Sequence, residues 1–414
     1  MKTISQRSVG GDQTASSPRL VILGAGITGM FLAYYLRKDG YEVRLIDKDP
    51  VGREASVYNA GLLTPSFAPT PQLSKLQLLS AVIGRRGPLY ISPMQVITHL
   101  SWFRIASGKA LTGFEESTMK IGKLSLRLYE EFFSTENINP DVAKGVVGLY
   151  RTAEDAKAFS TRFGGKLLEP AEISRMGYKG LEGGILVESE FSINPAKLFK
   201  QLRTRIQEMG VVITLDKEAR LDDGARPRAR YMLDGKVFEA DSIIVSAGSW
   251  TRTLCNQVGF EPEILPASGL VMIYDTGGRR VIARPTLLED YGIGIAQHDD
   301  HTLRVTSFFE MVGFKKHYGE GRKKWLVDIV SRHVTDLSKL RLVEEGIGFR
   351  PCTPDQFSVI GRVPYYENLY VASGNCRLGV TLAPASAYIL RSIIRGEDCL
   401  DEIKPLLSPE RFHS

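Results

Sequence analysis

A chain of 414 residues is too long for one small hydrophobic core, so we expect two domains or one large fold in two parts. Hydrophobic residues make up 43% of the chain and charged residues 24%, which is typical of a globular protein and argues against general disorder. The formal net charge of +6 is spread along the sequence. It fits attraction to small anions or anionic surfaces and does not require a nucleic acid partner.

The sequence contains few patterns typical of targeting segments or metal sites. Residues 1–18 are polar and lack the apolar centre of a secretory signal, so we expect a flexible tail. No apolar run is long enough to cross a bilayer, and no HExxH, GxSxG or GxxxxGK[ST] motif occurs. The four cysteines show no CxxC spacing, so we expect reduced thiols in a cytoplasmic protein and neither a disulfide framework nor a zinc site. They are Cys255, Cys352, Cys376 and Cys399.

The most specific motif is RLVILGAGITGMFLAYYLRKDGYEVRLIDKD at residues 19–49, which predicts a strand, a glycine-rich turn, a helix and a second strand. Gly24 would permit the tight turn, Gly26 would let a diphosphate approach the backbone, and Gly29 would let the helix pack closely on the strand. Asp47 ends the second strand, where a carboxylate can accept hydrogen bonds from ribose hydroxyls. This order indicates a dinucleotide-binding unit and leaves FAD or NAD open.

Three later segments favour FAD over NAD. REASVYNAGLLTP (53–65) would place a small polar loop directly after the second strand, close to a diphosphate and a flavin edge. EADSIIVSAGSWTRTL (239–254) predicts a buried strand followed by a second close approach of backbone to the cofactor. NLYVASGNCRLGVTLAPASAYILRSIIRG (368–396) predicts a strand, a turn and a helix whose N-terminus would stabilise negative charge on a reduced flavin.

The residues of these segments form the predicted cofactor site. They are Gly24, Ala25, Gly26, Ile27, Thr28, Gly29, Asp47, Lys48, Ser56, Asn59, Ala60, Gly61, Leu62, Ala219, Ala247, Gly248, Trp250, Gly374, Arg377, Leu378, Gly379, Val380 and Thr381.

Taken together, the motifs resemble the D-amino acid oxidase/glycine oxidase superfamily of flavoproteins, and within it the D-amino acid dehydrogenase branch. GAGITG, SVYNAGLLTP, GGILVESEFSINPAKL, SAGSW, GFRPCTPDQFSVIG and GNCRLGVTLAP carry the resemblance in the order typical of the family. It implies an α/β fold with a discontinuous, Rossmann-like FAD-binding domain and an α+β substrate-binding domain built on an antiparallel sheet. The expected ranges are 19–88, 189–255 and 345–405 for the first domain, and 89–188 and 256–344 for the second.

Alternating apolar runs within the second domain support this layout. Residues 270–275, 292–297 and 302–314 read as antiparallel strands, while residues 97–134 have helical periodicity and are expected to decorate the same domain. His298 and His301 lie between two of these strands, where we expect a solvated hairpin turn and no metal site.

The sequence departs from the family pattern near the flavin. Family members often carry Gly-His-Gly where this chain has Gly374, Asn375 and Cys376, and a bulky aromatic residue where it has Val380. Gly348 occupies the position at which sarcosine oxidases attach their flavin through a cysteine. The resemblance therefore implies that FAD is bound non-covalently.

The resemblance also implies the chemistry, in which a hydride passes from the substrate Cα to flavin N5 and no protein side chain is catalytic. The arginine of the family's GxRP segment grips the substrate carboxylate, and this role falls on Arg350, whose planar fork matches a carboxylate. A structural ion pair with an Asp or Glu is the alternative for Arg350. Tyr58 and Tyr291 are further candidates for substrate contact, and ordinary packed tyrosines are the alternative for both.

The leading functional hypothesis is FAD-dependent oxidation of the Cα–N bond of D-amino acids, D-proline-like secondary amines included, to an imino acid. A glycine/sarcosine-type amine oxidase is the near alternative. An NAD-dependent dehydrogenase is the distant one, because it would not explain SAGSW or GNCRLGVT. The electron acceptor would be a quinone or oxygen. Basic runs at 315–318 and 322–325 indicate either a solvated surface or peripheral contact with the inner face of a membrane.

Overall fold

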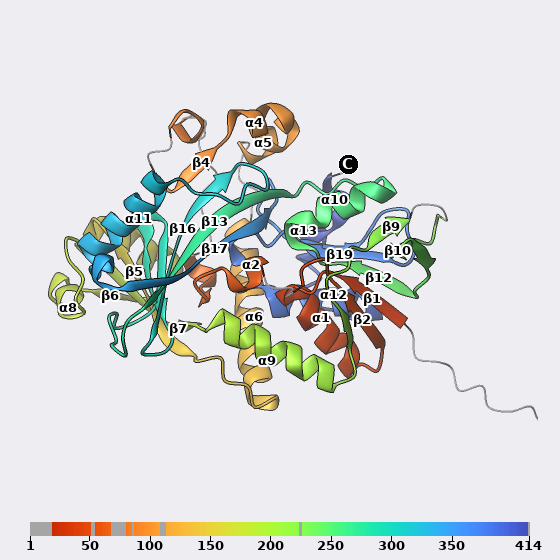
Figure 1. Cartoon of the computed structure of the whole chain (residues 1–414), viewed down its shortest axis with the longest axis horizontal. Coiled ribbons are helices and arrows are strands. Elements are labelled where there is room, and N and C mark those ends of the chain that lie inside the picture. Colours follow the sequence, from red (N-terminus) through yellow and green to blue (C-terminus); the bar gives the residue numbers. More distant parts are fainter. Residues whose placement is uncertain are drawn as a thin grey trace, which may run out of the picture.

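The computed structural model describes residues 19–50, 54–67, 80–84, 87–107, 113–222 and 226–412. The predicted tail at residues 1–18 and Arg53 of the polar loop lie outside these residues. Two large sheets dominate the structure, and Figure 1 shows them side by side.

The first sheet has six strands and contains the predicted dinucleotide-binding unit. Five strands run parallel, and the edge strand β18 pairs antiparallel with β19. Short apolar strands are typical of parallel sheets that are covered on both faces. The strand order is β18 (Val359–Arg362), β19 (Leu369–Ser373), β12 (Ser242–Val245), β1 (Arg19–Leu23), β2 (Glu42–Ile46) and β8 (Val212–Thr214).

Alternate residues of these strands serve two separate cores. Leu20 and Ile22 of β1 pack into the cluster formed with the helices, whereas Val21 and Leu23 face the small sheet. This alternation is the two-residue period of a β-strand covered on both faces. The helices are α1 (Ile27–Lys38), α6 (Phe114–Thr135), α9 (Pro195–Glu208) and α12 (Ala383–Arg395). The small sheet comprises β9 (Arg220–Asp222), β10 (Arg230–Leu233) and β11 (Lys236–Phe238), and α10 (Thr251–Cys255) joins the same cluster.

Helix α6 packs differently from the expectation that residues 97–134 decorate the substrate domain. Leu128, Tyr129 and Phe132 belong to the core around α1 and α12, and the Tyr129 hydroxyl donates to the carbonyl of Val380 at 2.7 Å. Its amphipathic pattern predicted the helix but not which of the two sheets it would cover.

The second sheet has ten strands and is mainly antiparallel. The hairpin between β15 and β16 confirms the predicted turn at residues 298–301, but His298 is buried and not solvated as expected. The strand order is β17 (Arg341–Cys352), β13 (Leu265–Asp275), β16 (Thr302–Met311), β15 (Ile293–Gln297), β14 (Thr286–Leu288), β5 (Ala143–Tyr150), β7 (Gly183–Ser192) and β3 (Leu62–Leu63). In addition, β4 (Leu89–Ile91) pairs with β16, and β6 (Lys166–Leu168) pairs with β7.

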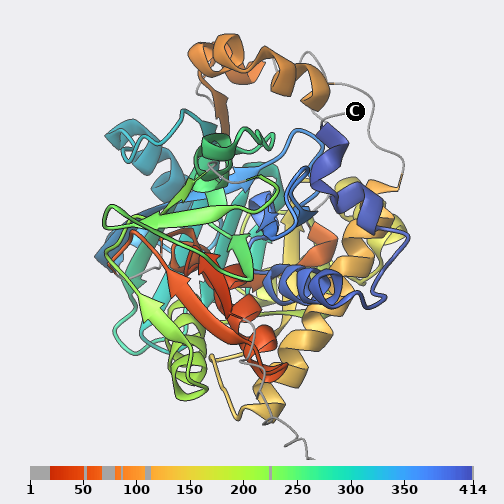
Figure 2. The same cartoon turned by 90° about the vertical axis from the view of Figure 1, so that its right-hand side faces the viewer.

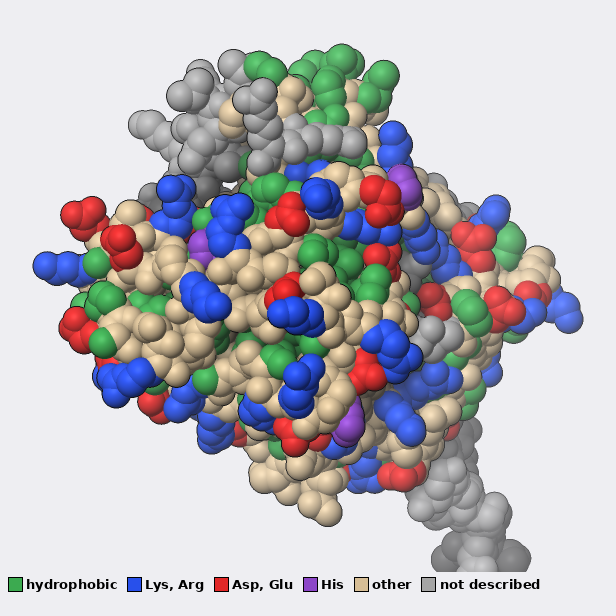
Figure 3. Space-filling view, turned by 60° about the vertical axis from the view of Figure 1, so that its left-hand side comes forward, with side chains coloured by type: hydrophobic (Ala, Val, Ile, Leu, Met, Phe, Trp, Pro, Cys, Tyr) green, Lys and Arg blue, Asp and Glu red, His purple; other side chains and the backbone are tan. Residues whose placement is uncertain are grey.

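The remaining helices are short, apart from two on the second sheet. They are α2 (Glu54–Val57), α4 (Pro93–Thr98), α5 (Leu100–Ala106), α7 (Ala153–Phe163), α8 (Pro170–Arg175), α11 (Glu320–His333) and α13 (Lys404–Leu407). Helices α4 and α5 stand away from the body in both ribbon views (Figures 1 and 2). Hydrophobic side chains gather over them at the top of Figure 3, and Met94, Ile97 and Leu100 are exposed there. No helix in the described part of the chain is both long and apolar enough to span a membrane.

Candidate active site

A cavity of about 650 Å³ lies between the two sheets. Its wall includes the first turn of α1, the loop after α2, parts of β16 and β17 and the turn before α12. Trp102 and Phe103 of α5 close it from the side of the projecting helices. Segments far apart in the sequence therefore meet at one site.

The glycines of the fingerprint form a cradle that matches a diphosphate. Gly24 has a φ of +116°, and a Cβ there would lie 2.3 Å from the carbonyl oxygen of Ser246. A Cβ on Gly29 would lie 2.0 Å from the carbonyl oxygen of Gly24. Helix α1 begins after Gly26 without a side-chain cap and without an acidic residue in its first turn. The Ile27 N–H donates to Ser56 Oγ at 2.9 Å, and the other N–H groups of the first turn, with the partial positive charge of the helix end, suit an anion. The residues present therefore fit a dinucleotide.

Asp47 lies where the first two strands of the unit end. Its Oδ2 accepts a hydrogen bond of 2.6 Å from the Ala25 N–H, and its Oδ1 accepts one of 2.8 Å from the Asp49 N–H. Burial raises the pKa of Asp47, although these two N–H groups act in the opposite direction. Each carboxylate oxygen keeps a further lone pair that a ribose hydroxyl can use.

Most of the predicted cofactor residues line this single cavity. Those on the wall are Gly24, Gly26, Ile27, Thr28, Asp47, Lys48, Ser56, Asn59, Ala60, Gly61, Leu62, Ala219, Ala247, Gly248, Trp250, Arg377, Leu378, Gly379, Val380 and Thr381. Ala25, Gly29 and Gly374 do not line the cavity, although each is next in sequence to a residue that does.

The two predicted tyrosines differ in their positions. Tyr58 lines the cavity, and a Cβ on Gly346 of β17 would come within 2.1 Å of its ring, so this glycine makes room for it. Tyr291 does not line the cavity, and its ring instead packs against His333 with centroids 5.3 Å apart. The structure therefore does not bring Tyr291 to the site.

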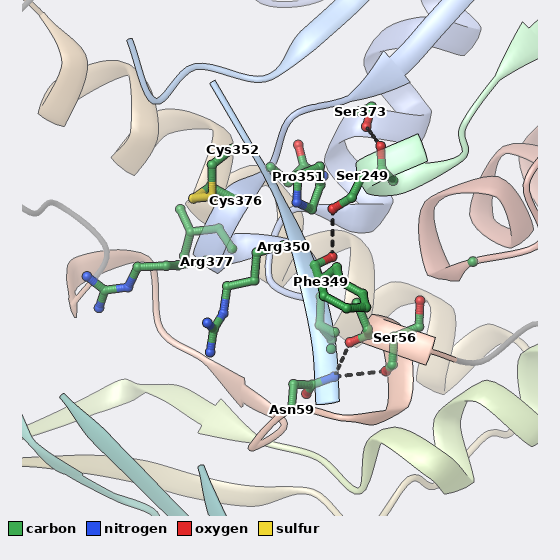
Figure 4. A pocket seen from close by; sticks show the side chains of 18 of the residues that line it. Ser56, Asn59, Ser249, Phe349, Arg350, Pro351, Cys352, Ser373, Cys376 and Arg377 are labelled. Carbon is green, nitrogen blue, oxygen red and sulfur yellow. Dashed lines mark hydrogen bonds between the residues drawn. A yellow bond between two sulfur atoms is a disulfide. The ribbon is translucent and has the colours of Figure 1, made fainter. Parts of the chain in front are cut away.

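Arg350 extends from β17 into the cavity (Figure 4). Its Nη1 donates to the carbonyl oxygens of Phe308 at 2.8 Å and Ser268 at 3.3 Å. Gly269 leaves space for the guanidinium, because a Cβ there would lie 2.3 Å from Nη2. Burial lowers the pKa of Arg350 to about 10, and the charge of Arg377 adds to the effect.

The alternative of a structural ion pair for Arg350 finds no support in the described part of the chain, where no carboxylate lies within ion-pair distance of it. The nearby carboxylate of Glu310 pairs instead with Arg322, at 2.7 Å. The half-buried Arg350 thus has backbone carbonyls as its hydrogen-bond acceptors and the ring of Phe309 6.0 Å away, and its remaining N–H groups can bind an anion.

The expectation of four reduced cysteines is wrong for two of them. Cys352 and Cys376 form a disulfide with their Cα atoms 4.2 Å apart, and both line the cavity (Figure 4). Only Cys255 and Cys399 are free. The sequence separation of 24 gave no spacing signal, because the pair is brought together by the packing of β17 against the turn before α12.

Sequence reasoning also missed two acidic residues. Glu289 lines the cavity, and burial raises its pKa to about 7, while the charge of Arg377 acts to lower it. Glu190 is 2% exposed and accepts a hydrogen bond of 2.7 Å from the Ser66 N–H, and burial raises its pKa to about 7. Glu289 lies in no quoted motif, and Glu190 lies within GGILVESEFSINPAKL, a segment that gave no signal for a buried carboxyl group. In the described part of the chain, no group of three or more His, Cys, Asp or Glu residues could hold a metal ion.

Known proteins share this architecture. D-amino acid dehydrogenase from Neisseria gonorrhoeae (strain NCCP11945) is 26% identical over 407 residues, covering 92% of this chain and 96% of that protein. The crystal structure of glycine oxidase from Geobacillus kaustophilus matches with a TM-score of 0.74 at 19% identity, over 95% of this chain and 99% of that one. The crystal structure of iminodiacetate oxidase from Chelativorans sp. BNC1 matches with a TM-score of 0.72 at 20% identity, over 94% of this chain and 99% of that one.

Residues 19–393 match the family described as FAD dependent oxidoreductase (DAO). The match spans both sheets, the glycine cradle and Arg350. The chain therefore belongs to the DAO family of FAD-dependent oxidoreductases, and its cofactor is FAD.

Proposed function

We propose that this FAD-dependent enzyme oxidises the Cα–N bond of D-amino acids, D-proline-like secondary amines included, to the corresponding imino acids. The observation that carries the proposal is Arg350, a half-buried guanidinium that faces the cavity, donates to two backbone carbonyls and forms no ion pair with a carboxylate among the described residues. The resemblance to D-amino acid dehydrogenases, at 26% identity over 92% of the chain, supports the choice of substrate.

Arg350 would bind the substrate carboxylate through the N–H groups that the carbonyls of Ser268 and Phe308 leave free. A fixed guanidinium binds the carboxylate and also orients the adjoining Cα, since two parallel hydrogen bonds define the plane of the carboxylate. Bound FAD supplies the hydride acceptor. Phe308, Phe309 and Met311 line the same cavity and would exclude water from the reacting carbon.

The substrate amine must lose its proton before the hydride leaves. Arg350 and Arg377 place positive charge in the cavity, which disfavours an ammonium group and lowers its pKa in the complex. The neutral amine of the bound substrate would then be the reacting form, and no general base is assigned to the chain.

Anaerobic mixing of the holoenzyme with D-, L- and N-methyl amino acids tests the proposal, with loss of the flavin absorbance as the readout. D-amino acids should bleach the flavin, and bleaching by L-amino acids alone would overturn the proposed chirality. Preferential bleaching by glycine and sarcosine would favour the amine oxidase alternative. Reoxidation of the reduced enzyme by oxygen or by a soluble quinone then separates an oxidase from a dehydrogenase.

A further inference from the structure

A second arginine lies beside Arg350 in the cavity. Arg377, in the turn before α12, lines the cavity and is exposed, and Figure 4 shows its side chain extending to the left while that of Arg350 extends downward. Among the described residues, Arg377 forms no hydrogen bond and no ion pair. Arg377, predicted above as a cofactor residue, therefore shares one cavity with Arg350, and in the described part of the chain neither forms an ion pair with a carboxylate.

A covalent link supports the placement of the two arginines. Cys352 lies two residues after Arg350, Cys376 immediately precedes Arg377, and the disulfide joins the two cysteines. A β-bridge between Cys352 and Asn375 adds a backbone connection at the same point. The strand that carries Arg350 and the turn that carries Arg377 therefore hold a defined separation, as a site for two anionic groups requires.

The two arginines repel each other in the cavity. Arg377 contributes to the lowered pKa of Arg350, so the two positive charges destabilise each other. One substrate carboxylate can neutralise one of them. Arg377 then remains as a second positive charge on the cavity wall, where a second carboxylate of the substrate can neutralise it.

Glu289 offsets the repulsion between the two arginines only in part. It lines the same cavity, but no ion pair within 4 Å joins it to Arg377 in the described part of the chain. Burial raises its pKa to about 7 despite the attraction of Arg377, so it carries only part of a negative charge near neutral pH. A basic substrate side chain would have this one carboxylate as its partner and two guanidinium groups as neighbours.

We propose that Arg377 forms a second carboxylate site, so that the preferred substrates are D-amino acids with an acidic side chain, such as D-glutamate or D-aspartate. This inference rests on the proposed function, with Arg350 binding the α-carboxylate and Arg377 the distal one. The neutral substrate D-glutamine has nearly the same shape as D-glutamate and lacks only the second charge.

The substrate pair D-glutamate and D-glutamine tests the second site in the wild type and in Arg377→Gln. The wild type should favour D-glutamate in kcat/KM by roughly 10- to 100-fold, and Arg377→Gln should abolish most of that preference. Arg362→Gln is the matched control, since Arg362 is exposed on β18, outside the cavity wall, and its loss changes the net charge equally. An equal loss for both substrates in Arg377→Gln would overturn the proposal.

Glu289→Gln gives an independent test, because it should change the preference for D-glutamate in the opposite direction to Arg377→Gln. Removing the negative charge should increase the preference for D-glutamate, because the distal carboxylate then meets less repulsion. The same variant tests the alternative that the cavity binds basic side chains. On that alternative, the wild type would prefer D-ornithine and Glu289→Gln would abolish this preference. That pattern would overturn the assignment of Arg377 to a carboxylate.

Equilibrium binding separates failure of this inference from failure of the proposed function. Succinate and succinamate differ by one charge and are not substrates, and perturbation of the flavin spectrum reports their dissociation constants without turnover. Succinate should bind at least 10-fold more tightly to the wild type, with the difference reduced in Arg377→Gln and increased in Glu289→Gln. Equal affinities in the wild type would overturn the second site. If succinate binds more tightly yet no amino acid bleaches the flavin, the proposed function fails and the anion site stands.

Discussion

The guanidinium of Arg350 donates a hydrogen bond of 2.8 Å from Nη1 to the carbonyl oxygen of Phe308. Phe308 has a φ of +70°, and it lies where the pairing of β16 with β13 shifts register opposite Gly269. A bulky residue with positive φ costs about 1 to 3 kcal/mol, so the surrounding sheet must impose this conformation. The irregularity turns a backbone carbonyl toward Arg350 and fixes its direction without using a carboxylate.

Arg350→Lys should retain FAD but lower kcat/KM for D-amino acids by about 100-fold or more. Lysine preserves the positive charge, but it lacks the fork that binds a carboxylate and a backbone carbonyl at once. Steady-state kinetics together with the flavin-to-protein absorbance ratio check this. Kinetics within a few fold of the wild type would contradict a role for guanidinium geometry.

Asp47→Asn should weaken FAD binding by about 10-fold or more, as expected for the loss of a charged hydrogen-bond acceptor. Asp47 accepts from the N–H groups of Ala25 and Asp49, and an asparagine would place its NH₂ group against one of these donors. FAD titration of the apoprotein measures the effect. Glu42→Gln, on the exposed face of the same strand, is the control and should bind FAD like the wild type.

Loss of the disulfide should destabilise the protein and loosen the cavity wall. Closing the loop between Cys352 and Cys376, at a sequence separation of 24, is worth about 3 kcal/mol by its effect on the unfolded chain. Cys376→Ser should lose this amount in denaturant unfolding, whereas Cys399→Ser should lose little. Thiol titration of the denatured wild type should count two free cysteines before reduction and four after it. Four thiols without reduction would contradict the disulfide.

Glu190→Gln should stabilise the protein at pH 8 more than at pH 5. Burial raises the folded-state pKa of Glu190 from 4.5 to about 7, so the wild type loses stability as pH rises through this window. The shift corresponds to about 3 kcal/mol at most, and a glutamine at the same position does not titrate. Thermal unfolding of both holoproteins at pH 5, 6.5 and 8 measures the difference. A pH-independent difference would contradict the assigned pKa.

The sequence predicted best those features whose residues lie within one continuous segment of the chain. The strand, turn and helix around Gly24, Gly26 and Gly29 form one continuous unit, whose spacing alone indicated the cradle. Arg350 was identified through a longer pattern shared with a family. Its backbone partners, Ser268 and Phe308, lie on other strands and follow only from the pairing of β17, β13 and β16.

The missed features are those that depend on packing between distant segments. Cys352 and Cys376 form a disulfide because the end of β17 meets the turn before α12, and no rule of cysteine spacing predicts this contact. Glu289 faces the cavity from a short turn between β14 and β15, where an acidic residue would ordinarily be solvated. Tyr291, two positions later, was proposed for the site, but its ring points to His333.

The most direct test of the central claim compares substrates with and without an α-carboxylate in the wild type and Arg350→Ala. The rate of anaerobic flavin reduction by D-alanine is measured against that by D-alaninamide, which keeps Cα and the amine but lacks the charge. The account predicts that the wild type favours D-alanine by about 100-fold or more and that Arg350→Ala loses most of this ratio while still binding FAD. An unchanged ratio in Arg350→Ala would show that another group binds the carboxylate and would contradict the account.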